Sequence, residues 1–161
     1  MSSKQIKINQ LSFQYQDKLI FKNLDFTINQ GDFALLTGPS GCGKSTLLKL
    51  IAGLEPTSTS KITTGSLTQP FTNWGMVFQD PNRQFTMATP REELIFALEN
   101  KLIDRVTAQK IIDEVSHKTN ISLLLDRPFL HLSGGEKQRV ALAVLIAMQS
   151  DLFLLDEPFA N

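Results

Sequence analysis

The sequence has 161 residues, enough for one domain with a hydrophobic core, and its 42% hydrophobic and 20% charged residues are ordinary for a globular protein. Lys and Arg number 16, as do Asp and Glu, so no basic excess favours binding to nucleic acid. The sequence has no apolar run long enough to span a membrane and no export signal at its start, and its single cysteine cannot pair within the chain. We therefore expect a cytoplasmic setting.

Four segments of the sequence are predicted to form strands. Apolar residues alternate with polar ones over 4–13 and over 19–28, which predicts antiparallel strands with one exposed face at the edge of a sheet. The run DFALLTG, residues 32–38, and the run DLFLLDEP, residues 151–158, are instead continuously apolar. Such runs are typical of parallel strands buried on both faces, so we expect both at the centre of a sheet.

Helices are expected mainly in the second half of the chain. Between Pro90 and Thr119 apolar residues recur at helical spacing, and a further helix is predicted from Leu132 onward. Prolines separate these segments, at Pro81, Pro90 and Pro128. The pattern predicts an α/β fold whose core is interrupted by a helical insert.

A glycine-rich loop follows the first of the predicted buried strands. The G-x-x-x-x-G-K-S spacing of a phosphate-binding loop is matched by Gly38, Gly43, Lys44 and Ser45. Lys44 would bind the β- and γ-phosphates, Ser45 would ligate Mg²⁺, and Thr46 would lie near the α-phosphate. The other residues predicted to surround the nucleotide are Pro39, Ser40, Gly41 and Cys42, the last through its N–H alone. The alternative is an ordinary glycine-rich turn between a strand and a helix.

Hydrolysis of a nucleotide also needs a second metal anchor and a group that orients the attacking water. The run LFLLDEP offers both. Asp156 ends a predicted buried strand, where a carboxylate is costly unless it faces a metal ion, and Glu157 is the candidate general base. Structural capping by these acids is the alternative.

A second candidate anion site lies in the stretch HLSGGEKQRVALAV. Ser133, Gly134 and Gly135 can cap the helix that Glu136 continues, which leaves N–H groups and a hydroxyl for an anion. The alternative is an ordinary helix N-cap without a ligand.

Together with the phosphate loop, LSGGEKQ resembles the signature sequence of the ATP-binding cassette (ABC) ATPases, and the resemblance covers essentially the whole chain. It implies a P-loop NTPase core, residues 1–79 and 138–161, with an antiparallel β edge subdomain, and an α-helical subdomain, residues 80–137, that carries the signature. It also implies that Tyr15 stacks on adenine and that Gln79 senses Mg²⁺ and the attacking water. Tyr15 could equally be a strand aromatic packed in the sheet.

The resemblance gives the second anion site a purpose. In ABC proteins the signature of one subunit covers the γ-phosphate held by the phosphate loop of another, so two ATP molecules are bound within a head-to-tail pair. We therefore expect a second ABC ATPase subunit, identical or related, as a partner. Closing and opening of the pair with ATP binding and hydrolysis would drive transport.

The segment FQDPNRQFTMATPREELIFALEN resembles the energy-coupling-factor branch, which serves vitamin and cobalt or nickel uptake. It departs from that branch by Ala97 in place of Gly and by Arg91 where acids are common. The branch implies integral membrane subunits as partners. A short helix of these subunits would enter a groove beside the loop that contains Gln79, called the glutamine loop. The branch also implies a peripheral location at the cytoplasmic face of the membrane. For Glu92, Glu93 and Lys101 we expect no more than solvation of a helix face.

Only four residues follow Glu157, whereas ABC ATPases continue through further strands and a histidine that contacts the γ-phosphate. His117 and His131 precede Asp156, so neither matches that histidine. We therefore expect a chain truncated after the strand that Asp156 ends, which is called the Walker B strand in this family. On its own, such a chain should retain nucleotide binding but show weak or absent ATP turnover.

Two other functions remain open: a soluble ABC ATPase of translation or DNA repair, and a nucleotide-dependent binding module without hydrolysis. The first usually has tandem cassettes or long coiled-coil inserts, for which the roughly fifty residues between Gln79 and Leu132 leave little room. A small nucleotide kinase has no use for LSGGEKQ.

Overall fold

The computed structural model describes residues 4–80 and 84–157, and the chain forms two compact units, residues 1–72 and 73–161. Pro81, which is predicted to separate two segments, and the residues after Glu157 lie outside the described parts. The predicted division into a core of residues 1–79 and 138–161 and a helical insert of residues 80–137 stays a prediction.

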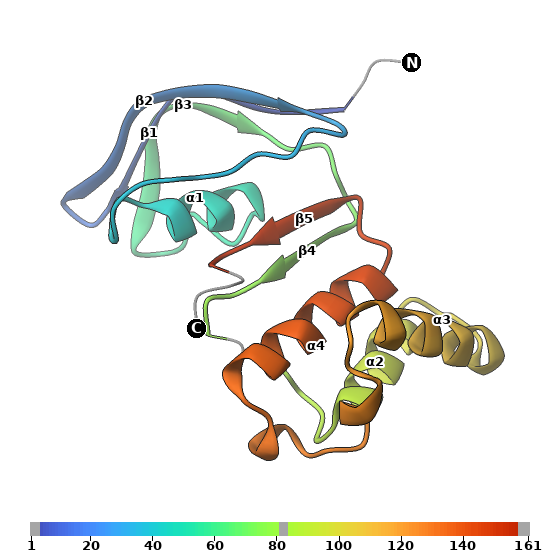
Figure 1. The fold of residues 1–161 in the computed structure, drawn as a ribbon. Helices are drawn as coiled ribbons and strands as arrows, with labels where there is room; N and C mark the ends of the chain where they lie inside the picture. The colour runs from blue at the N-terminus through green and yellow to red at the C-terminus, as the bar shows by residue number, and fades with distance from the viewer. Residues whose placement is uncertain (1–3, 81–83, 158–161) are drawn as a thin grey trace. The chain divides into compact units, whose positions relative to one another are not determined.

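The first unit contains an antiparallel sheet with the strand order β2-β1-β3 (Figure 1). β1 (Gln5–Tyr15) and β2 (Lys18–Asn29) form a hairpin, which confirms both alternating strands, and β3 (Ser60–Thr68), which we did not predict, pairs with β1 on its other side. The register of β1 shifts between Ile8 and Leu11. A bulge of this kind lets Leu11 and Phe13 stay buried although they are an odd number of residues from Ile8.

Helix α1 (Lys44–Ile51) begins directly after the glycine-rich loop, and Leu47, Leu48, Leu50 and Ile51 are its buried residues. The predicted buried strand over 32–38 is wrong: these residues form no strand, and the side chains of Phe33 and Leu35 are 91% and 76% exposed. A parallel strand obtains its hydrogen bonds only from neighbouring strands. The sheet to which β1 belongs is antiparallel and does not include this run.

The second unit begins with a parallel pair of strands. β4 (Trp74–Val77) lies beside β5 (Leu152–Leu155), in a register that pairs Trp74 with Leu152 and Val77 with Leu155. β5 confirms the predicted strand in DLFLLDEP, but the expected central position is wrong for the described residues, because β5 has a neighbour on one side only. Phe153, on this strand, is accordingly 44% exposed.

The predicted helices of the second unit are all present: α2 (Pro90–Glu99), α3 (Arg105–Lys118) and α4 (Gly134–Ala147), with short 3-10 turns at Ser122–Leu124 and Phe129–His131. Side-chain caps fix their starts, at Thr89, Asp104 and Ser133. Among the described residues no helix has both the length and the apolar character that crossing a membrane requires.

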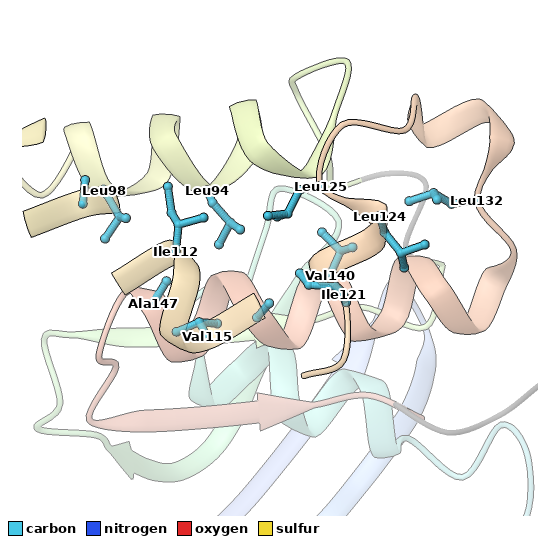
Figure 2. Packing of buried hydrophobic residues seen from close by; sticks show 12 residues of the cluster. Leu94, Leu98, Ile112, Val115, Ile121, Leu124, Leu125, Leu132, Val140 and Ala147 are labelled. Atoms are coloured by element: carbon cyan, nitrogen blue, oxygen red, sulfur yellow. The ribbon is translucent and has the colours of Figure 1, made fainter. Parts of the chain in front are cut away.

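A hydrophobic core joins these three helices (Figure 2). Leu94 of α2, Ile112 of α3 and Val140 of α4 are at most 1% exposed and belong to one cluster. Ile121, Leu124, Leu125 and Leu132 extend the cluster through the segment between α3 and α4. This packing fixes the start of α4, which carries the signature sequence.

Candidate functional site

The glycine-rich loop has a backbone that only glycine adopts easily. Gly41 and Gly43 have φ angles of +79° and +103°, in the left-handed region. A Cβ atom on Gly43 would lie 2.8 Å from the ring of Phe21 and 2.9 Å from Ile20, so this position has no room for a side chain. Gly43 is also the N-cap of α1, and no side chain caps this helix. The start of α1 therefore has no side-chain cap.

Lys44 folds back over the loop that precedes it. Its Nζ donates to the carbonyl oxygens of Gly38, at 3.0 Å, and Pro39, at 3.2 Å. The tip of the loop is closed by a hydrogen bond from the N–H of Cys42 to Pro39, and Pro39 to Cys42 are exposed. A cation, a helix N-terminus and a curled backbone therefore lie together in one exposed loop, an arrangement suited to phosphate groups.

Tyr15 lies at the end of β1, and its ring is partly exposed. The ring contacts Phe13 edge-on, with centroids 5.2 Å apart, and the hydroxyl donates to Oε1 of Glu55 at 2.7 Å. Burial and the hydrogen bond to the Glu55 carboxylate raise the pKa of Tyr15, while a hydrogen bond with Thr46 lowers it in part. The predicted aromatic is therefore held beside the helix that follows the phosphate loop.

The parallel strands bring two predicted catalytic residues together. β4 and β5 end at the same edge, so that Gln79 and Glu157, 78 residues apart in sequence, follow neighbouring strand ends. Nε2 of Gln79 donates to Oε2 of Glu157 at 2.8 Å. Asp156 is 5% exposed, and its N–H donates to the carbonyl of Val77.

The signature segment forms a reciprocal cap at the start of α4. Oγ of Ser133 accepts from the N–H of Glu136 at 3.3 Å, and the Glu136 carboxylate accepts from the N–H of Ser133 at 2.7 Å. Arg127 lies nearby, with its guanidinium 3.5 Å from the Glu136 carboxylate. The hydrogen bond from the Ser133 N–H is the main cause that lowers the pKa of Glu136. Ser133 and Glu136 therefore hold each other at the start of α4.

Two acids have roles that sequence reasoning missed. Glu93, expected only to solvate a helix face, is 7% exposed, and its Oε2 accepts the N–H groups of Thr86 and Met87. Glu92 accepts from the N–H of Thr89 in the capping box of α2, so the expectation was wrong for both. Lys101 likewise donates to the side chain of Asn73. The T-x-x-E pattern could have revealed the cap at Glu92, whereas no spacing pattern marks Glu93.

Comparison with known proteins explains why these features occur in one chain. A family model described as "ABC transporter" matches residues 21–160. The chain belongs to the ABC transporter family. This membership confirms the predicted resemblance, which rested on the phosphate loop and LSGGEKQ.

Individual ABC proteins are similar over nearly the whole chain. The ATP-binding protein YkoD of Bacillus subtilis, named for HMP/thiamine import, is 39% identical over 95% of this chain and 31% of its own length. The energy-coupling factor transporter ATP-binding protein EcfA1 of Mycoplasma mobile is 38% identical over 94% of this chain and 59% of its own length. The chain thus spans less than two thirds of these curated relatives.

A solved ABC structure gives the same result for the fold. The structure of cbiO1 from Clostridium perfringens, described as part of the ABC transporter complex cbiONQ, matches with a TM-score of 0.83 and 28% sequence identity. The match covers 99% of this chain and 68% of that one. It confirms the predicted α/β fold with an antiparallel sheet and a set of helices.

Proposed function

We propose that this chain binds and hydrolyses ATP as an ATPase subunit of an ABC importer. The hydrogen bond between Gln79 and Glu157 is the observation that carries the proposal. An amide that can orient water, placed against a carboxylate that can accept its proton, is the pair that hydrolysis requires beside a bound phosphate.

Each predicted site residue has a separate role in the proposed reaction. Lys44 binds and neutralises the β- and γ-phosphates after exchanging the carbonyl oxygens of Gly38 and Pro39 for phosphate oxygens. Tyr15 stacks on the adenine. Glu157 accepts the proton of the attacking water, which Gln79 orients. The Ser133 hydroxyl and the N–H groups of α4 bind the γ-phosphate of ATP held by a second ATPase subunit.

Mg²⁺ is the cofactor that fits these residues. Within residues 4–80 and 84–157, no group of three or more His, Cys, Asp or Glu side chains could hold a metal ion. Mg²⁺ is usually bound by few protein groups together with nucleotide phosphates, and the sequence motifs assign this role to Ser45, Gln79 and Asp156. When bound, the ion supplies charge neutralisation of the triphosphate.

We further propose that integral membrane subunits bind a groove of the second unit and hold the ATPase at the cytoplasmic face of the membrane. The groove has a volume of about 350 Å³ and an apolar lining that includes Phe85, Met87, Phe129 and Leu130. Phe85 and Phe129 stack with centroids 4.0 Å apart, and Leu130 is 92% exposed. A short amphipathic helix suits such a groove. The likeness to EcfA1 supports the energy-coupling-factor type, and we propose a vitamin or a metal ion as the transported solute.

Single-turnover hydrolysis of radiolabelled MgATP, with protein in excess, tests the enzymatic part. Glu157→Gln should slow phosphate release by about 100-fold or more, since general-base catalysis contributes at least that factor. Glu99→Gln removes an exposed carboxylate of α2 and serves as the control. Equal rates for Glu157→Gln and the unmodified chain would refute the general base. Binding of MgATP without any hydrolysis would favour the binding module.

Affinity purification from solubilised membranes tests the partners. We expect integral membrane subunits and a second ABC ATPase to co-purify, and a charge in the groove, Leu130→Asp, to remove the membrane subunits. Leu123→Asp, equally exposed at 93% but outside the groove lining, is the matched control. Recovery of ribosomes without an integral membrane protein would instead support the soluble alternative.

A further inference from the structure

Tyr15 and Glu55 form a pair that joins two separate stretches of the first unit. They are 40 residues apart in sequence, and the Tyr15 hydroxyl lies 2.7 Å from Oε1 of Glu55. Glu55 follows the end of α1, and its N–H donates back to the carbonyl of Lys49 in the last turn of that helix. The pair therefore connects the end of β1 to the helix that opens with the phosphate loop.

Glu55 is itself held from its other oxygen. Oε2 accepts from the N–H of Thr57, at 3.1 Å, and from the hydroxyl of Ser60. Ser60 pairs with Tyr15 across the β1–β3 ladder. The next residue, Gln16, donates its N–H to the carbonyl of Thr59 at 2.9 Å. Both ends of the Tyr15–Glu55 hydrogen bond are therefore anchored in the same few residues, and the Glu55 carboxylate cannot turn away without breaking a second contact.

We propose that Glu55 is a positioning residue that holds the phenol of Tyr15 and thereby fixes the aromatic ring in place before adenine binds. This inference rests on the proposed function, in which Tyr15 stacks on the base. A carboxylate only accepts, so the phenol has one direction in which to donate. Phe13 contacts the ring edge-on, at an interplanar angle of 87°, and restricts it from a second direction.

The ionisation states agree with this arrangement. Burial acts to raise the pKa of Glu55, but the hydrogen bonds from Ser60, Tyr15 and Thr57 outweigh it and lower the pKa. The pKa of Tyr15 is raised by burial and by the same hydrogen bond. Near neutral pH the pair therefore consists of an ionised acceptor and a protonated donor, a charge-assisted hydrogen bond of the stronger kind.

A ring that is already immobile loses less side-chain entropy on binding a base. Loss of the anchor should therefore weaken binding of the adenine and leave binding of the phosphates unchanged. The expected loss is about three- to tenfold in affinity for MgATP, from the cost of immobilising one rotamer-rich side chain. Glu55 is not placed to touch the phosphates, so any weakening of phosphate binding would have another cause.

Isothermal titration with MgATP and, separately, with magnesium tripolyphosphate tests the inference. Tyr15→Phe keeps the ring and removes the anchor, and Glu55→Ala removes the other partner. Each should weaken MgATP binding about three- to tenfold and leave tripolyphosphate binding unchanged. The double variant should bind like either single variant, because both changes break one interaction. Glu114→Ala, on exposed α3, is the control.

The outcomes separate the inference from the function it rests on. Unchanged MgATP affinity in Tyr15→Phe, additive losses in the double variant, or equal losses for tripolyphosphate would overturn the positioning role while leaving the ATP site intact. Tyr15→Phe keeps the aromatic ring and is expected to fold. It therefore tests the positioning role of Glu55 even if Glu55→Ala does not fold. If Tyr15→Leu binds MgATP like the unmodified chain, Tyr15 does not stack on adenine, and the inference fails with that assignment.

Discussion

The starts of α1 and α4 are both predicted anion sites, but only the start of α4 has a side-chain cap. α1 begins at Gly43, in the left-handed region, and no side chain caps it. α4 begins at Ser133, whose side chain forms a complete capping box with Glu136. The first helix start therefore depends on backbone shape, whereas the second is stabilised by its own side chains.

This difference has a functional meaning in the proposed cycle. A site that must bind ATP by itself benefits from a helix start without a side-chain cap, because no capping bond has to be broken first. A site that meets ATP only when a second subunit arrives must remain folded in the meantime. The capping box of α4 provides that stability.

The two helix starts should respond in opposite directions to alanine in place of glycine. Gly43→Ala places a Cβ 2.8 Å from the ring of Phe21 at a φ of +103°, and should lower the free energy of unfolding by about 2–4 kcal/mol. At Gly135 no atom lies within 4 Å of the added Cβ, and the residue is helical. Gly135→Ala should therefore raise that free energy by up to about 1 kcal/mol. Urea unfolding of both variants checks the contrast, which equal destabilisation would contradict.

Removal of the Lys44 ammonium group should weaken nucleotide binding at the start of α1. Lys44→Ala should weaken MgATP binding by about 10- to 100-fold, since hydrogen bonds to charged groups contribute about 1.5–3 kcal/mol. Isothermal titration measures the loss, with Lys61→Ala, on exposed β3, as the control. Titration of Ser133→Ala under conditions in which the chain is monomeric should give the unmodified affinity. A loss in Ser133→Ala equal to that in Lys44→Ala would show that the signature binds the same nucleotide in the same subunit.

The capping box should contribute measurably to stability where α1 has no equivalent. Ser133→Ala should lower the free energy of unfolding by about 1 kcal/mol, the usual cost of losing a serine N-cap. Thr89→Ala, which removes the matching box of α2, should cost a similar amount. Ser66→Ala, on exposed β3, is the control in urea unfolding. A Ser133→Ala chain as stable as the control would mean that the cap is not formed in solution.

Whether a feature could be predicted from the sequence depended on how far apart in sequence its interacting residues lie. The capped helices and the β1–β2 hairpin were predicted because their partners lie within a few residues or directly across a short turn. The strand predicted over 32–38 was wrong, because its hydrogen bonds would come from strands distant in sequence, and Phe33 is 91% exposed instead. In the candidate site, motifs located Lys44 and Glu157, but the Tyr15–Glu55 pair depends on a contact across 40 residues that no spacing announces.

The smallest predicted effect is the loss, in acid, of the stability that the Glu136 carboxylate gives to the start of α4. The N–H of Ser133 and then its side chain lower the pKa of Glu136, and Arg127 and Arg139 add to this. Because the pKa is lower in the folded state than in the unfolded one, Glu136 stabilises the fold above the ordinary pKa range of a glutamate. That contribution is lost as the pH falls through the folded-state pKa. The first turn of α1 contains no acidic residue, so its start has no corresponding dependence.

Unfolding in urea at a series of pH values between 7 and 3 measures this effect in Glu136→Gln against the unmodified chain. The unmodified chain should be slightly more stable at neutral pH, and the gap should close in acid as the carboxylate of Glu136 becomes protonated. Glu99→Gln, which removes an exposed charge at the end of α2, is the control for the loss of a carboxylate. If the gap for Glu136→Gln were the same at pH 3 as at pH 7, the ionised carboxylate would not be what stabilises the start of α4, and the cap would depend on the Ser133 hydroxyl alone.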